Sequence, residues 1–462
     1  MSGNSRVELL LALDRAGTIR LRAQLEQQLR SAVRDGLLAP GTSLPSTRQL
    51  ARELAISRGV VVEAYAQLAA EGYLAARQGA PTRVAESAFG PVDVAAEPLP
   101  EPPPRFDFRP GAPDVSLFPR ARWLASLRRS LRAAPDARFD YGDPRGAPEL
   151  RGALVRHLGR VRGVACEPER VIVTSGMSQG MALLGRTLVA RDTRRIGVED
   201  PWSAPARDQL AATGLEPVPI AVDAAGLRMD LLAAAAPAAV VVTPAHQFPT
   251  GVVLAPERRA ALAEWAIRSD AFVLEDDYDA EYRYDRAPVG AVQGLAPDHV
   301  IYAGSVSKTL APALRLGWLV VPERLTAAIA AAKAMDDLGT PVVEQLALAD
   351  FLERGELGRH LRRTRAIYRG RRDALVAALA HHLPHCAPAG VAAGLHLVVH
   401  LPPALDERAV LERARAAGIG LHGLGDHSVR PQPPALLLGY GRIAHAAIEP
   451  GVRALAAALH GA

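Results

Sequence analysis

Apolar residues near the start of the chain recur at helical spacing. One such run begins at Leu21 and ends at Asp35-Gly36, where the glycine can close a helix. A second, short helix is expected after Ser46, because Gln49 lies three positions later in a capping-box pattern. A third is expected after Ser57, another residue type that caps helices. The pattern therefore predicts three short helices in this part of the chain.

Two short strand-like runs follow these helices, at 73–75 and 82–84, and can pair as a hairpin across Gly79-Ala80-Pro81. Three helices and a hairpin are the elements of a winged helix-turn-helix domain, which we assign to residues 1–85. Residues 86–106 then hold six prolines among acidic and small residues, a composition typical of a semi-rigid, extended linker. A larger domain is expected over residues 107–462.

In this larger domain, short apolar runs typical of strands alternate with helical stretches. The strand-like runs are 171–174, 196–198, 240–243, 272–274, 300–303 and 318–321. Alternation of this kind predicts an α/β domain with a mainly parallel sheet and helices on both faces. Ligands of such sheets bind beyond the carboxyl ends of the strands, and several polar clusters of this chain lie there.

Composition narrows the class of protein. With 462 residues, 49% of them hydrophobic and 22% charged, the chain predicts a soluble protein of two or three domains. The longest apolar stretch, 231–245, is interrupted by prolines and is too short to span a bilayer. No apolar leader is present and the only two cysteines are far apart, so we expect a cytoplasmic protein without a membrane or a metal site.

The net charge of +5 is concentrated near the N-terminus, since residues 1–85 hold 11 arginines and 7 acidic residues. This excess favours an anionic partner such as nucleic acid. In a winged helix, the start of the third helix enters the major groove of double-stranded DNA, and arginines hold the phosphates. The candidate contacts are Ser46, Thr47, Arg48, Ser57, Arg58, Gly59 and Arg77. The alternative is that these arginines are solvated charges on a small helical domain.

Only two of the 54 basic residues are lysines, Lys308 and Lys333. Arginine can replace lysine as a surface cation, but it cannot supply the primary amine that forms a Schiff base with an aldehyde cofactor. Lys333 lies in an alanine-rich helical stretch and is expected to be an ordinary surface cation. Lys308 follows a strand in Ser305-Val306-Ser307-Lys308, which makes it the candidate for cofactor chemistry.

Residues at other strand ends supply the remaining parts of a pyridoxal phosphate site. Asp276 would keep the pyridine nitrogen protonated, and Tyr278 would hydrogen-bond the phenolate oxygen. Small and hydroxyl residues that open a helix, with an arginine able to bind two oxygens, would hold the phosphate. These phosphate candidates are Ser175, Gly176, Met177, Ser178, Ser305, Ser307 and Arg315.

Two sets of motifs resemble known families. Leu44-Pro45-Ser46-Thr47-Arg48-Gln49-Leu50-Ala51 and Glu71-Gly72-Tyr73-Leu74 look like the DNA-binding domain of GntR-type regulators, over nearly all of residues 18–84. This resemblance implies a double-stranded DNA operator as partner. At the wing tip, Gly79-Ala80-Pro81-Thr82 replaces the usual Gly-Ser-Gly-Thr turn, and Pro81 removes a backbone donor.

The larger domain resembles fold-type I aminotransferases, and the fused architecture resembles the MocR/GabR subfamily of GntR regulators. The motifs are Asp140-Tyr141-Gly142-Asp143-Pro144-Arg145-Gly146, His246-Gln247-Phe248-Pro249-Thr250-Gly251, Asp276-Asp277-Tyr278-Asp279 and Gly304-Ser305-Val306-Ser307-Lys308 with Leu314-Arg315-Leu316-Gly317. The resemblance implies a small C-terminal α+β subdomain and a head-to-tail homodimer. Tyr141 would then reach the phosphate of the partner subunit's cofactor.

The sequence departs from the aminotransferase pattern at three places. Phe248 stands where these enzymes have an asparagine that bonds the phenolate oxygen. Trp202, the candidate to stack on the cofactor ring, lies one place before the usual position. Leu437 takes the place of the arginine that binds a substrate carboxylate, and the candidate substitutes are Arg207, Arg430 and Arg442.

These departures favour a transcriptional regulator that binds pyridoxal phosphate through Lys308 and senses the cofactor or its adduct with a small amino compound. No physiological turnover is expected from it, although residual transaminase activity is compatible with this function. The alternative is a working aminotransferase with an accessory N-terminal domain. A third hypothesis keeps the DNA-binding role and treats the cofactor pocket as vestigial.

Overall fold

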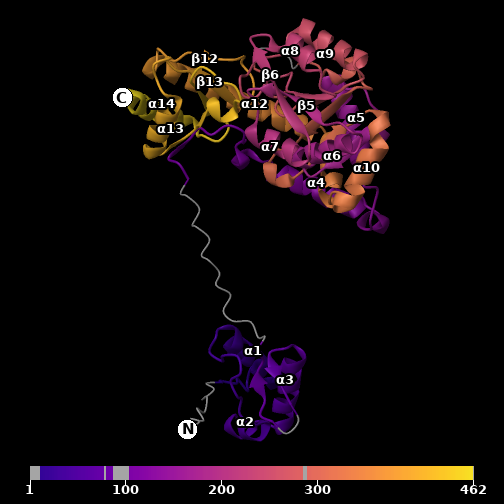
Figure 1. Cartoon of the computed structure of the whole chain (residues 1–462), viewed down its shortest axis with the longest axis vertical. Coiled ribbons are helices and arrows are strands. Elements are labelled where there is room, and N and C mark those ends of the chain that lie inside the picture. The colour runs from indigo at the N-terminus through magenta and orange to yellow at the C-terminus, as the bar shows by residue number, and fades with distance from the viewer. Residues whose placement is uncertain (1–10, 78–79, 87–102, 285–288, 461–462) are drawn as a thin grey trace. The chain divides into compact units, whose positions relative to one another are not determined.

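The computed structural model describes residues 11–77, 80–86, 103–284 and 289–460. Its contacts divide the chain into two compact units, Met1–Glu101 and Pro102–Ala462, both drawn in Figure 1. Most of the predicted linker, residues 87–102, lies outside the described residues, as does Gly79 at the predicted wing tip. Within the described ranges, no helix has the length and apolar character needed to cross a membrane.

The N-terminal unit contains the three helices and the hairpin that the pattern predicts. They are α1 (Leu21–Arg34), α2 (Thr47–Glu53), α3 (Arg58–Ala70), β1 (Leu74–Ala75) and β2 (Arg83–Val84). The two strands pair antiparallel. One apolar core, with Leu25, Leu50 and Tyr65 among its buried residues, joins the helices and the hairpin. Ser46 and Ser57 cap α2 and α3, because their hydroxyl oxygens accept backbone N–H groups of the first helical turn.

Two details of this unit differ from the sequence-based expectation. The Gln49 side chain donates to Glu53 Oε1 at 2.9 Å, one turn further along the helix, instead of completing the capping box. The segment before α1 also contacts the helix-turn-helix, which the pattern did not predict. Arg15 donates to the carbonyl oxygens of Leu54 and Ala55 at 3.0 and 2.8 Å, at the turn between α2 and α3. A charged side chain therefore satisfies carbonyl groups that the end of a helix leaves free.

The larger unit is built on an eight-stranded sheet in the order β4-β11-β10-β9-β8-β5-β6-β7. The strands are β4 (Val171–Thr174), β5 (Arg195–Asp200), β6 (Glu216–Asp223), β7 (Gly226–Leu227), β8 (Ala239–Val242), β9 (Phe272–Asp276), β10 (Val300–Ser305) and β11 (Gly317–Val320). Parallel pairing joins β10, β9, β8, β5 and β6. β11 and β7 run antiparallel to their neighbours. Every predicted strand run is present, whereas β6 and β7 were not predicted.

Helices cover both faces of this sheet, as the alternating pattern predicts. On one face lie α6 (Met177–Val189), α7 (Ala204–Ala212) and α10 (Glu323–Asp337). On the other lie α5 (Pro148–Arg162), α8 (Met229–Ala235), α9 (Pro256–Arg268) and α11 (Val342–Glu353). In β8, Val240 and Val242 belong to one apolar cluster and Val241 to the other. This is the arrangement of a parallel strand that is buried on both faces.

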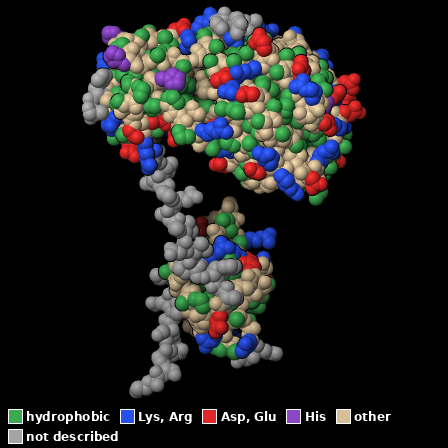
Figure 2. All heavy atoms as spheres, turned by 45° about the horizontal axis from the view of Figure 1, so that its top comes forward, with side chains coloured by type: hydrophobic (Ala, Val, Ile, Leu, Met, Phe, Trp, Pro, Cys, Tyr) green, Lys and Arg blue, Asp and Glu red, His purple; other side chains and the backbone are tan. Residues whose placement is uncertain are grey.

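Shorter elements complete the larger unit. α4 (Arg120–Ala133) packs on α11, where the Trp123 and Phe351 ring centroids lie 5.7 Å apart. The 3-10 helices are η1 (Val115–Leu117), η2 (Asp136–Phe139), η3 (Pro168–Arg170), η4 (Gln293–Leu295), η5 (Pro312–Leu314) and η6 (Gly425–His427). On the face of this unit drawn in Figure 2, arginine and acidic side chains are interspersed. The visible face therefore has no broad patch of one charge.

The C-terminal part forms the smaller subdomain that the aminotransferase resemblance implies. Its antiparallel sheet has the order β12-β13-β16-β15. The elements are β12 (Pro388–Ala389), β13 (His396–His400), β15 (His422–Gly423) and β16 (Ala435–Gly439), with α12 (Glu356–His382), α13 (Glu407–Ala416) and α14 (His445–His460).

The end of the predicted linker belongs to this subdomain. β3 (Phe106–Asp107) pairs in parallel with β14 (Ile419–Gly420), and Phe106 is buried in the main apolar cluster. Burying its aromatic ring away from water stabilises this pairing. The structure therefore assigns Phe106, the last residue of the predicted linker 86–106, to the folded unit.

Candidate functional site

A cavity of about 650 Å³ lies beyond the carboxyl ends of β9 and β10. Most of the predicted cofactor residues line it: Met177, Ser178, Trp202, Asp276, Tyr278, Ser305, Ser307, Lys308 and Arg315. They come from segments far apart in the sequence, each of which follows or ends a strand of the large sheet. The fold therefore brings these residues together, at the edge where ligands of such sheets bind.

Lys308 follows β10, and its side chain is partly buried in the cavity. Its Nζ donates to the carbonyl oxygen of Gly111. Burial lowers the pKa of this ammonium group below the ordinary lysine value, although the nearby Asp279 and Asp276 carboxylates oppose the change. A lowered pKa increases the fraction of neutral amine, which is the nucleophilic form of a lysine.

Asp276 is the last residue of β9 and pairs in register with Ala303 of β10. Burial, and then the charge of Asp277, raises the pKa of Asp276 to about 7, while Lys308 opposes this rise. Asp277 itself serves the fold, because it forms a buried ion pair with Arg162 at 2.6 Å. Of these two adjacent carboxylates, Asp276 is the one that lines the cavity.

Tyr278 lies in the cavity wall with its hydroxyl group 3.0 Å from Nδ1 of His246. The same nitrogen lies 3.0 Å from Asp279 Oδ2. Burial raises the pKa of the Tyr278 hydroxyl well above its ordinary value, so the group is a donor at neutral pH. His246, Asp279 and His396 also have the spacing of metal ligands, since one ligand atom of each lies within 4.8 Å of the others. Nδ1 of His246, however, already contacts Tyr278 and Asp279.

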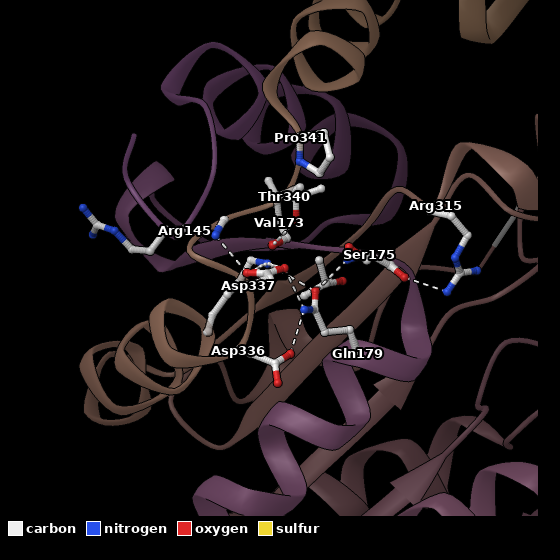
Figure 3. Close-up of polar contacts among 12 residues, drawn as sticks. Arg145, Val173, Ser175, Gln179, Arg315, Asp336, Asp337, Thr340 and Pro341 are labelled. Carbon is white, nitrogen blue, oxygen red and sulfur yellow. Dashed lines mark hydrogen bonds and ion pairs between the residues drawn. The ribbon is translucent and has the colours of Figure 1, made fainter. Parts of the chain in front are cut away.

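The predicted phosphate residues meet at one corner, where β4 leads into α6. Gly176 precedes α6 with a φ of 87°, and a Cβ at this position would lie 2.9 Å from Arg315 Nη2. Arg315 donates from Nη2 to the carbonyl oxygen of Ser175 at 2.6 Å (Figure 3). The N–H groups of the first turn of α6 have no partners within the helix, which makes this corner suitable for an anion. Ser175 and Gly176 shape the corner without lining the cavity.

Trp202, the candidate stacking residue, follows β5 and is only 1% exposed. Its backbone N–H donates to the carbonyl oxygen of His427 at 2.9 Å. The side chain lines the cavity next to Ser203, which occupies the position where the aminotransferase pattern has the stacking aromatic residue. Trp202 therefore lies at the cavity, and its stacking role stays a prediction.

The three candidate substitutes for the missing carboxylate arginine differ in position. Arg442 lines the cavity and lies 3.6 Å from Asp107 Oδ2. Arg207 and Arg430 are not among the residues that line it, and Arg430 instead donates to the carbonyl oxygen of Pro219 at 3.4 Å. The spacing of residues in the sequence cannot separate these three arginines, because their distances to the cavity depend on loops from different parts of the fold.

Tyr141 is 85% exposed and does not line this cavity. It borders a second hollow of about 620 Å³ that Leu338, Gly339 and Thr340 also line. The prediction that it reaches the site of a partner subunit is compatible with this position.

Phe248 lines the cavity, whereas Leu437, the other apolar replacement, is not among the residues that line it. Leu437 is fully buried in β16, opposite Val398 of β13, in a cluster with Leu424. Phe248 lines the cavity with its ring perpendicular to that of Tyr278, at a centroid distance of 6.1 Å. His396 also lines the cavity, and burial lowers its pKa to about 4, so this imidazole is neutral.

Lys333 is not the surface cation that the sequence suggests. It is completely buried in α10, and its Nζ lies 2.7 Å from Asp337 Oδ2 and 3.2 Å from Gln179 Oε1. The prediction was wrong because the neighbours of Lys333 in α10 are mostly alanines, which give no amphipathic pattern to distinguish the buried face. Its rarity as a lysine was the one available signal.

Sequence reasoning also missed a buried polar group behind Phe248. Thr243, which lines the cavity, donates to Glu199 Oε2 at 2.5 Å, and Gln247 Nε2 donates to the same oxygen at 3.2 Å. Burial raises the pKa of Glu199 to about 7. Two segments far apart in the sequence contribute to this group, so no local pattern could have indicated it.

The predicted DNA contacts lie at the start of α2, at the start of α3 and beside the hairpin. All of them are exposed except the half-buried Thr47: Ser46, Arg48, Ser57, Arg58, Gly59 and Arg77. Arg58 Nε lies 3.5 Å from Thr47 Oγ1, so the two helix N-termini are neighbours. A winged helix joined to a fold-type I aminotransferase domain with such a cavity defines a class, namely DNA-binding regulators built on an enzyme scaffold.

Comparisons with known proteins agree with this class. Residues 21–84 match the gntR family of bacterial regulatory proteins, and residues 111–447 match aminotransferase class I and II. The chain is 33% identical to the probable rhizopine catabolism regulatory protein MocR of Rhizobium meliloti, over 97% of this chain and 96% of that protein. It is 36% identical to the pyridoxine biosynthesis regulator PdxR of Corynebacterium glutamicum, over 85% and 86% of the two chains.

Among solved structures, the kynurenine aminotransferase of Pyrococcus horikoshii in complex with PMP is similar to this chain with a TM-score of 0.71. It is 26% identical, and the match covers 77% of this chain and 91% of that one. The chain therefore belongs to the MocR-type GntR family of transcriptional regulators, which carry an aminotransferase-like domain and bind an operator DNA.

Proposed function

We propose that this regulator binds pyridoxal phosphate through Lys308 and that the cofactor, or its adduct with a small amino compound, controls its action on DNA. The observation that carries the proposal is the arrangement of the cavity. An amine with a lowered pKa, a buried carboxyl group and an anion corner at a helix N-terminus all border one space of about 650 Å³. These are the groups that an aldehyde, a pyridine nitrogen and a phosphate require.

The residues present fit this cofactor. Gly176 leaves the space beside Arg315 that a side chain would fill, and Lys308 Nζ lies 3.8 Å from the position of a Cβ on Gly111. Asp276 would pair with the pyridine nitrogen, and Tyr278 would donate to the phenolate oxygen. Ser178, Ser305, Ser307 and Arg315 would hold the phosphate, and Trp202 would cover the ring. When bound, pyridoxal phosphate supplies an aldehyde carbon and an electron-accepting ring.

The other side of the cavity favours sensing over turnover. With Leu437 buried among apolar residues, β16 supplies no cation for a substrate carboxylate. Arg442 is the arginine at the cavity that would attract such a carboxylate, and it is exposed. A solvent-screened arginine holds an anion weakly compared with a buried, bidentate one. The effector is therefore pyridoxal phosphate itself or a loosely held amino compound.

The relatives support this proposal. By its name, PdxR of Corynebacterium glutamicum regulates pyridoxine biosynthesis, which suggests a cofactor-related signal for this chain too. The alternative, a working aminotransferase, is supported by the likeness to the archaeal enzyme over 77% of the chain. Two chains would form a head-to-tail dimer in which Tyr141 contacts the cofactor of the other subunit, and the ligand would favour one placement of the two winged helices.

Absorbance and DNA footprinting test the proposal. The purified chain with pyridoxal phosphate should be yellow, and Lys308→Ala should lose this absorbance. A footprint on the DNA next to its own gene should change when pyridoxal phosphate is added to the wild-type chain but not to Lys308→Ala. Arg58→Ala should abolish the footprint and leave the absorbance unchanged. A colourless wild-type chain would refute the proposal, and sustained transamination at ordinary enzymatic rates would favour the alternative.

A further inference from the structure

The buried lysine in α10 lies directly behind the phosphate corner. Lys333 Nζ makes three close contacts, with Asp337 Oδ2 at 2.7 Å, Asp337 Oδ1 at 3.0 Å and Gln179 Oε1 at 3.2 Å. Its side chain is 0% exposed. An ammonium group has three donors, and all three are accounted for by these acceptor atoms. Because Lys333 is fully buried and all its donors have partners, its ammonium group has a specific structural role that a surface lysine would not have.

Gln179 connects this lysine to the corner. Its Oε1 accepts from the Ser175 backbone N–H at 2.8 Å as well as from Lys333. Its Nε2 donates to Asp336 at 2.9 Å and to Asp337 at 2.8 Å. Figure 3 shows Gln179 between Ser175 and the two aspartates. Lys333 can only donate hydrogen bonds and the two aspartates can only accept them. These partners therefore fix the amide of Gln179 with its oxygen, and not its NH2 group, toward Ser175.

Both polar groups of Ser175 are thereby held by side chains. Gln179 accepts from its N–H, and Arg315 donates to its carbonyl oxygen at 2.6 Å. Gly176 and the first turn of α6 follow immediately, so the direction of the N–H groups at the corner depends on how Ser175 is held. If the Gln179 amide turned over, its NH2 group would face the Ser175 N–H, donor against donor.

We propose that Lys333 is a positioning residue for the phosphate of the bound cofactor, acting through Gln179 and Ser175. This inference rests on the proposed function and adds a residue to it. The guanidinium group of an arginine is planar and larger than an ammonium group, so it does not fit a fully buried site whose three acceptors surround one nitrogen. Both lysines of this arginine-rich chain therefore serve one site, Lys308 for the aldehyde and Lys333 for the phosphate.

The experiment compares pyridoxal phosphate with pyridoxal, which lacks the phosphate, by absorbance titration of the full chain. In the wild type, the phosphate should contribute a large part of the affinity. In Lys333→Met we expect the dissociation constant for pyridoxal phosphate to rise about tenfold or more, and that for pyridoxal to change less than about twofold. Lys333→Arg should behave like Lys333→Met.

Gln179→Met is the second variant, because it removes the contact with Ser175 and leaves the Lys333–Asp337 pair in place. It should show the same selective loss even if Lys333→Met folds poorly. Arg186→Gln is the matched control, since Arg186 contacts Asp336 at 2.8 Å but does not contact Lys333 or Ser175. It should bind both compounds as the wild type does.

The inference is overturned if Gln179→Met binds both compounds like the wild type, or loses affinity for both equally. Wild-type selectivity in Lys333→Arg would overturn the requirement for lysine. If the wild-type chain itself takes up neither compound, the proposed function fails, and this inference fails with it. The wild-type titration thus separates the two failures.

Discussion

The two sides of the cavity differ in the residues they present. On the side of the large sheet, Lys308, Asp276 and Arg315 converge on one space, and the Ser175 backbone is held at both ends. On the side that faces the C-terminal subdomain, Phe248 and the neutral His396 line the cavity, and Leu437 is buried in β16 without lining it. In our proposal the first side holds the phosphorylated aldehyde, whereas among the described residues of β16 no cation is present for a substrate carboxylate. If the proposal holds, cofactor binding and substrate turnover depend on separate parts of the scaffold.

The largest effect on stability is expected from Leu437→Arg, which places a charge inside a buried apolar cluster of the C-terminal subdomain. An unpaired guanidinium group among Val398, Leu424 and Ala435 should reduce the free energy of unfolding by roughly 3–5 kcal/mol. Urea denaturation of the cofactor-free protein measures this. Leu437→Met, which conserves volume, should cost less than about 1.5 kcal/mol. If Leu437→Arg were nearly as stable as the wild type and also catalysed transamination, this single residue would account for the difference between a sensor and an enzyme.

A second test concerns the charge state of Asp276. Its pKa of about 7 in the folded chain exceeds the value of about 3.9 in an unfolded one, so the folded chain binds this proton more tightly. The resulting stability is fully present below the unfolded pKa and is lost as the pH rises through about 7. Asp276→Asn cannot ionise and should avoid this loss.

Thermal unfolding without cofactor at several pH values measures this difference. Between pH 5 and pH 8, the stability of Asp276→Asn relative to the wild type should increase by at least about 1 kcal/mol. Asp192→Asn, at a side chain that is 98% exposed, is the control and should show no such trend. A constant difference between variant and wild type would contradict the buried, protonated carboxyl group.

Gly176→Ala should weaken the cofactor side at the corner itself. The added Cβ would lie 2.9 Å from Arg315 Nη2, on a backbone with positive φ. We expect the affinity for pyridoxal phosphate to fall about tenfold, which corresponds to about 1.4 kcal/mol. Gly163→Ala introduces a similar backbone strain at φ 66° with no atom within 4 Å of the Cβ. It should lower stability without changing the cofactor affinity, and equal losses in both variants would assign the effect to strain alone.

The smallest effect is expected at Arg442. Because this arginine is exposed, Arg442→Leu should reduce the binding of a carboxylated amine by about threefold or less, within the range of exposed ion pairs. The spectral change on adding alanine, compared with ethylamine, reports the carboxylate contribution. Arg430→Leu, which alters a residue outside the cavity lining, should leave the alanine response unchanged. If Arg430→Leu loses more of the alanine response than Arg442→Leu, our proposal names the wrong arginine as the carboxylate partner.

The sequence predicted the parts of the structure that depend on local patterns. Alternating apolar runs located six of the strands, and the small residues before Met177 and around Lys308 marked the strand ends at the cavity. The helix caps at Ser46 and Ser57 were also predictable, since each requires only a few adjacent residues.

Features that depend on distant contacts were not predictable. The burial of Lys333 requires Gln179 from another helix, and Phe106 becomes part of a strand only because β14 lies beside it. The choice among Arg207, Arg430 and Arg442 likewise depends on which loops close over the sheet. The sequence identified arginine as the type of residue that could bind a carboxylate, but tertiary packing decides which arginine lies at the cavity.

The pairing of β3 with β14 has a mechanical consequence. The chain leaves the linker at Phe106, passes Asp107, which lies 3.6 Å from Arg442, and within a few residues reaches Gly111, whose carbonyl oxygen accepts from Lys308. The tether of the DNA-binding unit is therefore continuous with the cavity wall. In the proposed regulator, we expect a ligand that draws Lys308 or Arg442 toward itself to pull on the segment that carries β3, so that the signal leaves the cavity along the backbone.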